Sequence, residues 1–329
     1  MEKKVAFIVV CWNNKKLLEE CIQSIKAQTY KNTAIYLIDN ASTDGSADYV
    51  EKNHPDIKLV RSDKNNGFAK GNNILIKKAS QDSSVGYFAF VNTDATLAPT
   101  WTEKLVVVAE SNPKTAGLQG LTMDYYNHHI TDSEHIYIAP NLQSTQYGYE
   151  KPVNKQNHAT HLVMGVNAAA AMYTRAFVDV QPFDTLFDES FFMYLEDVDV
   201  SLRAFNMGWA NYFVADAHAY HMGSVSSKTR SSDFALYWTS RNQFALLTKN
   251  MPARVFWRSF PKFAKFEIQF IRHLRKNYSK KTARVYIKGR FVGALRAPLY
   301  ISKRWKVASK SKITPDYYYS VMAKSGILG

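Results

Sequence analysis

The first 110 residues alternate between short apolar runs and segments whose apolar residues recur at helical spacing. Residues 5–10 are continuously apolar, as expected of a strand buried on both faces. The predicted strands are residues 5–10, 35–38, 57–60 and 87–91, and the predicted helices are residues 17–25, 46–53, 73–79 and 101–109. Strands alternating with helices in this way predict βαβ units and a mostly parallel sheet, the α/β class.

Polar residues stand just past the carboxyl ends of three predicted strands, where open parallel sheets bind their ligands. These residues are Asn13, Asp39 and Asp94. The first strand is not followed by a glycine-rich dinucleotide fingerprint, and the chain has no phosphate loop of the Walker type. A pyrophosphate ligand would therefore need a metal ion, and a carboxylate at a strand end favours Mg²⁺ or Mn²⁺.

Two acidic motifs suggest chemistry. Glu196 and Asp197 are adjacent where an aromatic run gives way to an apparent helix over residues 198–206, and Asp94 follows the fourth predicted strand. Carboxylates at such places suit two tasks, gripping a metal-bound phosphate and removing a proton from a hydroxyl. A sugar transferase with a nucleotide-activated donor needs both. The alternative is that each acid merely caps a helix or a turn.

Composition limits the other classes of protein. A chain of 329 residues with 46% hydrophobic and 14% aromatic residues can bury a large core as one or two domains. No uncharged apolar run approaches the ~18–20 residues of a membrane-spanning helix, and the first residues lack a signal-peptide pattern. Cys11 and Cys21 cannot form a disulfide framework, so a reducing cytoplasm is expected.

The net charge of +14 is concentrated in the last part of the chain. Residues 241–329 hold 21 Lys and Arg but only Glu267 and Asp316 as acids, a net +19, whereas the rest carries −5. We expect a catalytic domain at 1–250 and a basic, mainly helical extension at 251–329. Aromatic and cationic residues interleave in this extension at helical spacing, which favours an amphipathic helix on an anionic membrane. The alternatives are helices packed on the domain, or a nucleic-acid-binding tail, which no recognised motif supports.

An ordered set of motifs resembles the family-2 glycosyltransferases of the GT-A fold, particularly their bacterial rhamnosyltransferase-like branch. The likeness covers roughly residues 4–250. Its pieces are IVVCWN at 8–13, IDNASTDGS at 38–46, NNGFAKGNN at 65–73, NTD at 92–94, FDESFFMYLEDVD at 187–199, Arg203, His221 and Arg241-Asn242.

The resemblance implies a Rossmann-like GT-A fold and a division of roles. Asp39 would accept hydrogen bonds from the donor's pyrimidine, Asp94 would bind the metal bridging the two phosphates, and Asp197 would deprotonate the acceptor hydroxyl. His221 would reach the metal or the diphosphate. The expected donor-binding residues are Asn13, Asp39, Asn40, Gly67, Gly71, Asn72, Asn92 and Asp94, the acceptor-side residues are Glu196, Trp209 and Gly165, and the metal ligands are Asp94 and His221.

The sequence thus predicts an inverting glycosyltransferase with a metal-bound diphosphate leaving group. Its donor would be a dTDP- or UDP-sugar, with rhamnose one candidate, and its acceptor a polysaccharide or lipid-linked glycan at the inner face of the cell membrane. The cofactor would be Mn²⁺ or Mg²⁺, although Asn92 replaces the first carboxylate of the aspartate-any-aspartate pattern and leaves the metal's identity open. No nucleic-acid partner is expected. The alternatives are a non-catalytic nucleotide-sugar-binding homologue, which would not need Asp197, and a nucleic-acid-binding α/β protein.

For several side chains, the sequence is consistent with two alternative roles. Asp199 and Arg203, four residues apart, form either an ion pair or substrate contacts. Glu196 positions the acceptor or caps the helix, and Trp12 stacks on a base or packs in the core.

Other residues are expected to be structural. His218 is one of them. The glycines 67 and 71, with Asn72, are expected to shape a loop under the nucleotide. The histidines at 128, 129 and 135 lie in a polar, irregular segment at 124–161, expected to form solvated acceptor-side loops rather than a metal cluster.

Overall fold

The structure, a computed structural model, describes residues 2–153, 159–223 and 232–328. Within them, eleven strands form one sheet. Their bounds are β1 (Lys4–Cys11), β2 (Thr33–Asp39), β3 (Lys58–Arg61), β4 (Val85–Val91), β5 (Ala95–Leu97), β6 (Thr115–Asp124), β7 (Ile130–Ser133), β10 (Lys151–Pro152), β11 (His161–Val163), β12 (Ala170–Thr174) and β13 (Ala210–His221). The main path runs β10-β7-β6-β12-β4-β1-β2-β3, and β5, β11 and β13 pair off it.

The central strands are parallel, as the alternation predicts. β1 pairs in parallel with β2 and β4, β2 pairs in parallel with β3, and β13 pairs in parallel with β6. β12 lies between β4 and β6 and is antiparallel to both. The ends of β1, β2 and β4 therefore meet at one edge of the sheet, where parallel sheets bind ligands.

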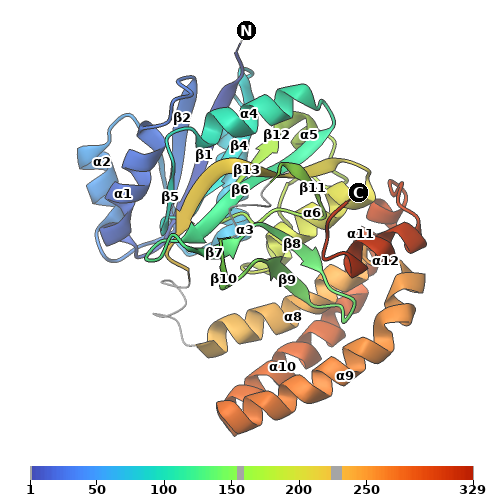
Figure 1. Cartoon of the computed structure of the whole chain (residues 1–329). Coiled ribbons are helices and arrows are strands. Elements are labelled where there is room, and N and C mark those ends of the chain that lie inside the picture. Colours follow the sequence, from blue (N-terminus) through green and yellow to red (C-terminus); the bar gives the residue numbers. More distant parts are fainter. Residues whose placement is uncertain (1, 154–158, 224–231, 329) are drawn as a thin grey trace.

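Helices cover both faces of this sheet (Figure 1). Their bounds are α1 (Lys15–Lys26), α2 (Ser46–Asn53), α3 (Gly67–Ala79), α4 (Trp101–Ser111), α5 (Arg175–Asp179), η1 (Glu189–Phe191) and α6 (Glu196–Asn206). Val5 and Phe7 of β1 belong to the core that contains α1 and α4, whereas Ala6 and Ile8 belong to the core that contains α3 and α6. This two-sided burial explains why the β1 sequence is apolar throughout.

Helix α3 begins six residues before the predicted helix at 73–79. The predicted loop around Gly67 and Gly71 is therefore wrong, because Gly67 opens the helix and Gly71 lies inside it. A side chain at position 71 would come within 3.2 Å of Val10 and Asn40. The close packing of α3 on β1 therefore requires a glycine at position 71. Because glycine destabilises helices, its presence in the sequence usually indicates a loop.

The segment after β6 contains more regular structure than predicted. Besides β7 and β10 it contains a separate two-stranded sheet, β8 (His135–Ile138) with β9 (Ser144–Tyr147). His135 is fully buried, and its Nε2 lies 2.8 Å from the Ser325 carbonyl oxygen. The prediction of a solvated loop is therefore wrong for His135. The sequence does not reveal β8 and β9, because strands of four residues are too short to show a clear alternation of apolar and polar side chains.

The C-terminal region is helical and packs on the rest of the chain (Figure 1). Its elements are α8 (Ser232–Asn250), α9 (Ala253–Asn277), α10 (Lys280–Arg296), η2 (Ala297–Tyr300), α11 (Ile301–Ala308) and α12 (Pro315–Ala323). One hydrophobic cluster joins Phe191, Val198 and Leu202 to Val255 and Tyr318. The packed core therefore continues across the predicted domain boundary at 250.

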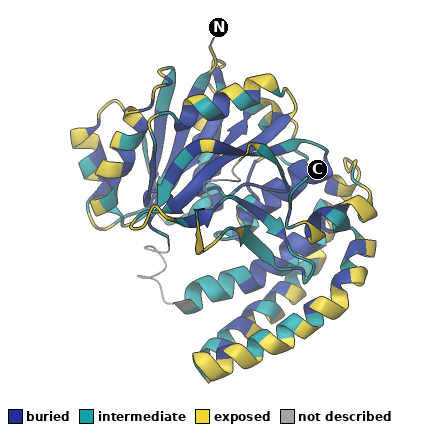
Figure 2. Cartoon of the chain, in the orientation of Figure 1, coloured by how far each residue is buried: buried dark blue, intermediate teal, exposed yellow. Residues whose placement is uncertain are grey.

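The outer faces of α9 and α10 remain exposed, while the central strands are buried (Figure 2). In the part of the chain that the structure describes, no helix combines the length and the hydropathy needed to cross a bilayer.

Candidate active site

A cavity of about 490 Å³ lies at the edge where β1, β2 and β4 end. Its other walls come from the start of α3, the β8–β9 hairpin, the segment leading into α6, and Thr239 of α8. Seven of the predicted site residues line it: Asn40, Gly67, Asn92, Asp94, Glu196, Asp197 and His221. Trp12 lines it as well. These eight named residues come from six separate segments and meet around one space large enough for part of a nucleotide sugar.

Asp39 lies at the end of β2, beside this cavity but outside its lining. Its Oδ2 accepts a hydrogen bond of 3.0 Å from the backbone N–H of Ser42. Its Oδ1 is buried and accepts none from the described residues. An unpaired buried acceptor is costly, so this oxygen is suited to a hydrogen-bond donor on a ligand.

The other predicted donor-side residues shape the backbone. Asn13 has φ 53°, and its Oδ1 accepts a hydrogen bond of 2.8 Å from the Thr43 N–H, which ties two loops together. Asn72 donates to the carbonyl of Phe68 within its own helix. Gly71 is packed against β1, and none of the three residues Asn13, Gly71 and Asn72 lines the cavity.

Asp94 and His221 are in direct contact. His221 Nε2 lies 3.3 Å from Asp94 Oδ1, and His221 Nδ1 lies 3.1 Å from Asp132 Oδ2 on β7. Burial lowers the pKa of His221, but hydrogen bonds to Asp132 and Asp94 outweigh it and raise the pKa to about 10. The carboxylates of Asp94 and Asp132, on either side of the imidazole, therefore favour its protonated form.

Glu196 and Asp197 are adjacent carboxyl groups in the first turn of α6. Asp197 Oδ1 accepts a hydrogen bond from the Val198 N–H at 2.8 Å, and its Oδ2 accepts one from the Ala168 N–H at 3.2 Å. Burial raises the pKa of Asp197, while these backbone hydrogen bonds oppose the rise. Burial, with the neighbouring Asp197 and Asp199 charges, raises the pKa of Glu196 well above its usual value. Ionising one carboxyl of the Glu196–Asp197 pair therefore costs less free energy than ionising both.

The two remaining acceptor-side predictions, Trp209 and Gly165, lie outside the cavity lining. Trp209 packs against Phe177, with ring centroids 5.6 Å apart. Gly165 accepts a hydrogen bond from the Ile136 N–H, and a side chain there would come within 2.5 Å of Ser201. These contacts are packing contacts. His218 is also outside the lining.

The segment leading into α6 has an unusual backbone. Phe192, Tyr194 and Leu195 have φ values of 62°, 69° and 68°. Met193 N–H donates to the Phe191 carbonyl across Phe192, which closes a γ-turn of the rare positive-φ kind. Each such residue costs on the order of 1–3 kcal/mol, so the surrounding contacts must hold the segment in place.

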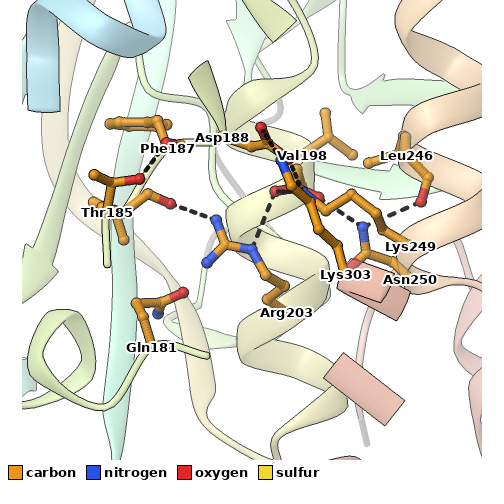
Figure 3. A network of polar contacts seen from close by, with 12 residues as sticks. Gln181, Thr185, Phe187, Asp188, Val198, Arg203, Leu246, Lys249, Asn250 and Lys303 are labelled. Carbon is orange, nitrogen blue, oxygen red and sulfur yellow. Dashed lines mark hydrogen bonds and ion pairs between the residues drawn. The ribbon is translucent and has the colours of Figure 1, made fainter. Parts of the chain in front are cut away.

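A buried ionic network anchors α6 to the C-terminal helices (Figure 3). Lys249 of α8 is fully buried and lies 2.7 Å from Asp188 and 2.9 Å from Asp199. Lys303 of α11 pairs with Asp188 at 2.8 Å, and Arg203 pairs with Asp199 at 3.1 Å. Asp199 and Arg203 therefore form an ion pair, the first of the two alternatives that their spacing left open. Because every charge has a partner, the cost of burying them is offset.

Sequence reasoning gave no role to Asp132, Lys249, Lys303 or Asn242. Asp132 sits in the segment read as loops, and no local pattern links it to His221, 89 residues away. The sequence places the two lysines only in a basic tail. Asn242 belongs to the motif set, but nothing in the sequence indicates its partner.

The family model described as glycosyl transferase family 2 matches residues 6–177, about half of the chain, and the chain belongs to this family. The N-acetylglucosaminyl-diphospho-decaprenol L-rhamnosyltransferase of Mycobacterium tuberculosis is 24% identical over 237 residues, which cover 65% of this chain and 74% of the relative. An uncharacterized glycosyltransferase of Haemophilus influenzae is 34% identical over 111 residues, a third of either protein's length.

Two solved structures share the fold. One is the mannosyltransferase PcManGT of Pyrobaculum calidifontis in complex with GDP-Man and Mn²⁺. The alignment covers 94% of this chain and 86% of the PcManGT chain, with a TM-score of 0.55 and 15% sequence identity. Residues 1-349 of S. aureus TarS, in complex with UDP, match 96% of this chain and 91% of their own with a TM-score of 0.54 at 16% identity. The predicted GT-A-like architecture is thereby confirmed.

Proposed function

We propose that this glycosyltransferase transfers a sugar, with inversion, from a dTDP- or UDP-sugar to a polysaccharide or lipid-linked glycan. The observation that carries the proposal is the meeting of Asp94, His221 and Asp197 on one cavity at the edge of the parallel sheet. Rhamnose is a candidate donor sugar because the Mycobacterium relative is named a rhamnosyltransferase.

Asp197 is the proposed general base. It lines the cavity, and the hydrogen bonds from Ala168 and Val198 fix its carboxylate in one orientation. A carboxylate aimed at an acceptor hydroxyl can remove its proton as the hydroxyl oxygen attacks the anomeric carbon, which gives inversion. Glu196 beside it has a buried Oε2 without a partner among the described residues, which suits a contact with the acceptor.

Asp39 is the proposed anchor of the nucleotide base. Its unpaired Oδ1 at the end of β2 can accept the ring N–H of a pyrimidine. Asn40 next to it donates to the Gly67 carbonyl at 3.0 Å and so holds the start of α3 close to the same edge. This arrangement supports a nucleoside diphosphate whose phosphates extend toward Asp94.

Asp94 and His221 are the proposed metal ligands. Both line the cavity, and an oxygen and an imidazole nitrogen are donors that Mn²⁺ accepts. No cluster of three metal-ligating side chains occurs in the described ranges, so substrate phosphates and water would complete the coordination. When bound, the ion neutralises charge on the departing diphosphate. Asp132 would orient His221 through Nδ1.

We also propose that the C-terminal helices bind an anionic membrane. Ile287, Phe291, Leu295 and Leu299 recur every four residues along the outer side of α10 and η2, and they are 40–65% exposed. Arg284 and Lys288 are exposed beside this outer stripe. An apolar face bordered by cations is typical of interfacial helices, and the +19 charge of residues 241–329 complements anionic lipid.

The function is tested by screening nucleoside diphosphate sugars for thermal stabilisation of the protein with Mn²⁺ or Mg²⁺, followed by transfer assays with those that bind. We expect a dTDP- or UDP-sugar to raise Tm and to be consumed when a lipid-linked glycan is supplied. Binding without any transfer, over a panel of acceptors, would favour a non-catalytic homologue. If no nucleotide sugar binds, the proposed function is wrong.

A further inference from the structure

The side-chain amide of Asn242, on α8, donates to three backbone carbonyls of the strained segment before α6. Its Nδ2 lies 3.0 Å from the Phe191 carbonyl oxygen and 2.9 Å from those of Met193 and Tyr194. Asn242 is 1% exposed. One side chain of a C-terminal helix therefore holds the carbonyls that flank Phe192 and the carbonyl of Tyr194.

The neighbouring residue fixes which way this amide points. Arg241 Nη1 donates to Asn242 Oδ1 at 2.6 Å and to the Ser190 carbonyl at 3.1 Å. Because Oδ1 accepts from a guanidinium, Nδ2 must face the three carbonyls. An amide N carries two hydrogens, so at least one of them is shared between carbonyls. An aspartate carboxylate has the same size but offers no donor, and the smaller alanine side chain offers none either.

The other side of the segment is held by α3. The Phe192 carbonyl accepts from the N–H groups of Phe68 at 2.8 Å and Ala69 at 3.3 Å. A side chain at Gly67 would lie 2.4 Å from the Phe192 oxygen, which explains the glycine there. The segment is thus clamped between the start of α3 and Asn242.

The segment sets the position of the proposed base. Leu195 is the residue before α6, and its carbonyl accepts from the Asp199 N–H at 3.0 Å to close the first turn. Asp197 lies within that turn. Met193, Tyr194 and Leu195 also line the cavity. A shift of this backbone would therefore move the carboxylate and one wall of the cavity together.

We propose that Asn242 is a positioning residue, which holds the 191–195 segment, with its three positive-φ residues, in place and thereby aims Asp197 at the acceptor. This inference rests on the proposed function, since it takes Asp197 as the base. It goes further in assigning to a C-terminal helix a part in the geometry of the reaction. Misplacement of a reacting group by about 1 Å can lower a rate ~10²-fold.

The test compares Asn242→Ala and Asn242→Asp with Asn206→Ala. Asn206 is a matched control because it is equally buried, donates one hydrogen bond to the Asn250 carbonyl and lies at the far end of α6. Hydrogen exchange of residues 190–198 reports the clamp whether or not the enzyme turns over. We expect both Asn242 variants to exchange there at least ~10-fold faster than the control.

Transfer kinetics report the positioning. We expect kcat to fall ~10–100-fold in Asn242→Ala and further in Asn242→Asp, where a carboxylate faces three carbonyls. The acid limb of the pH–kcat profile should move, which a loss of stability alone would not cause, while UDP or dTDP binding stays within about threefold. Unchanged exchange at 190–198 would overturn the clamp. Faster exchange with unchanged kcat and pH profile would overturn the positioning role. If the wild type transfers no sugar at all, the proposed function fails and hydrogen exchange alone judges the clamp.

Discussion

At the residue scale, the proposed chemistry depends on the basicity of Asp197. Replacing it with Asn keeps its size and removes the base, so kcat should fall by a factor on the order of 10²–10⁴. Binding of the nucleotide should be nearly unchanged, because Asp197 belongs to the α6 side of the cavity. Steady-state kinetics and nucleotide titration separate the two effects. Near-normal turnover in this variant would place the base elsewhere.

The proposed dependence of nucleotide binding on a metal ion can be tested at Asp94. Asp94→Ala should weaken binding of a nucleoside diphosphate in the presence of Mn²⁺ by at least ~10-fold and have little effect in its absence. Chelation of wild type should lower activity, and added Mn²⁺ or Mg²⁺ should restore it. Calorimetric titration with and without EDTA measures this. Full activity after exhaustive chelation would mean that cationic side chains, rather than an ion, bind the diphosphate.

At the scale of single elements, α6 is held by charges buried beneath it. Lys249→Met leaves Asp188 with Lys303 and Asp199 with Arg203, but removes the cation between the two carboxylates. We expect a loss of about 3–5 kcal/mol in the free energy of unfolding, measured by urea denaturation. Lys303→Met is the matched control, because that lysine is 35% exposed and pairs with Asp188 alone, and its loss should be smaller. Equal effects of the two substitutions would contradict this account.

His135, in the β8–β9 hairpin, should make the free energy of unfolding depend on pH. Burial lowers the pKa of His135 to about 4 from the usual 6.5, against an opposing hydrogen bond to Ser325. Its Nδ1 is buried without a partner among the described residues, so a second proton would have no acceptor. Between pH 6.5 and 4 the unfolded chain binds a proton that the folded chain does not, and stability should fall as pH falls, by on the order of 3 kcal/mol in all.

His135→Gln should remove much of this dependence. The measurement is urea unfolding at several pH values between 4 and 7. The variant should lose stability at pH 7 but show a flatter profile toward acid. A profile that stays parallel to that of the wild type would assign the pH dependence to other groups.

The same elements show what the sequence can predict and what it cannot. The strands around Asp39 and Asp94 could be predicted because their apolar runs are buried on both faces, and parallel order fixes where they end. The start of α3 could not, since Gly71 is required by packing against Val10, a contact absent from any local pattern. Asp132 and Asn242 act through partners tens of residues away, so only the folded chain brings them to the site.

At the scale of the whole molecule, the exposed outer stripe of α10 and η2 predicts reversible binding to anionic bilayers. The full chain should bind liposomes containing an anionic lipid, with affinity falling as salt rises. Replacing Phe291, Leu295 and Leu299 with Ser should weaken binding even at low salt, since the apolar contribution does not depend on ionic strength. Liposome co-sedimentation measures both effects.

Two comparisons make that experiment decisive. Tyr126 and Val107 lie outside the C-terminal helices and are as exposed as the stripe, so Ser at these positions should leave liposome binding unchanged. Turnover on a short soluble acceptor should also be unaffected in the triple variant. If liposomes do not bind the chain even at low salt, the stripe and its cations do not form a membrane surface, and the helices are better regarded as a packed lobe.

The hydrophobic cluster that joins Phe191 and Leu202 to Val255 and Tyr318 limits how this enzyme can be recombined. A chain cut after Asn250 would leave apolar surface next to Asp197 facing water. The segment from η1 to α12 must then be inherited as one block. In this block, a substitution in a C-terminal helix can select for a compensating change beside the proposed base, Asp197. Chimeras that exchange donor preference should therefore place their crossover well before Glu189, and keep everything after it from a single parent.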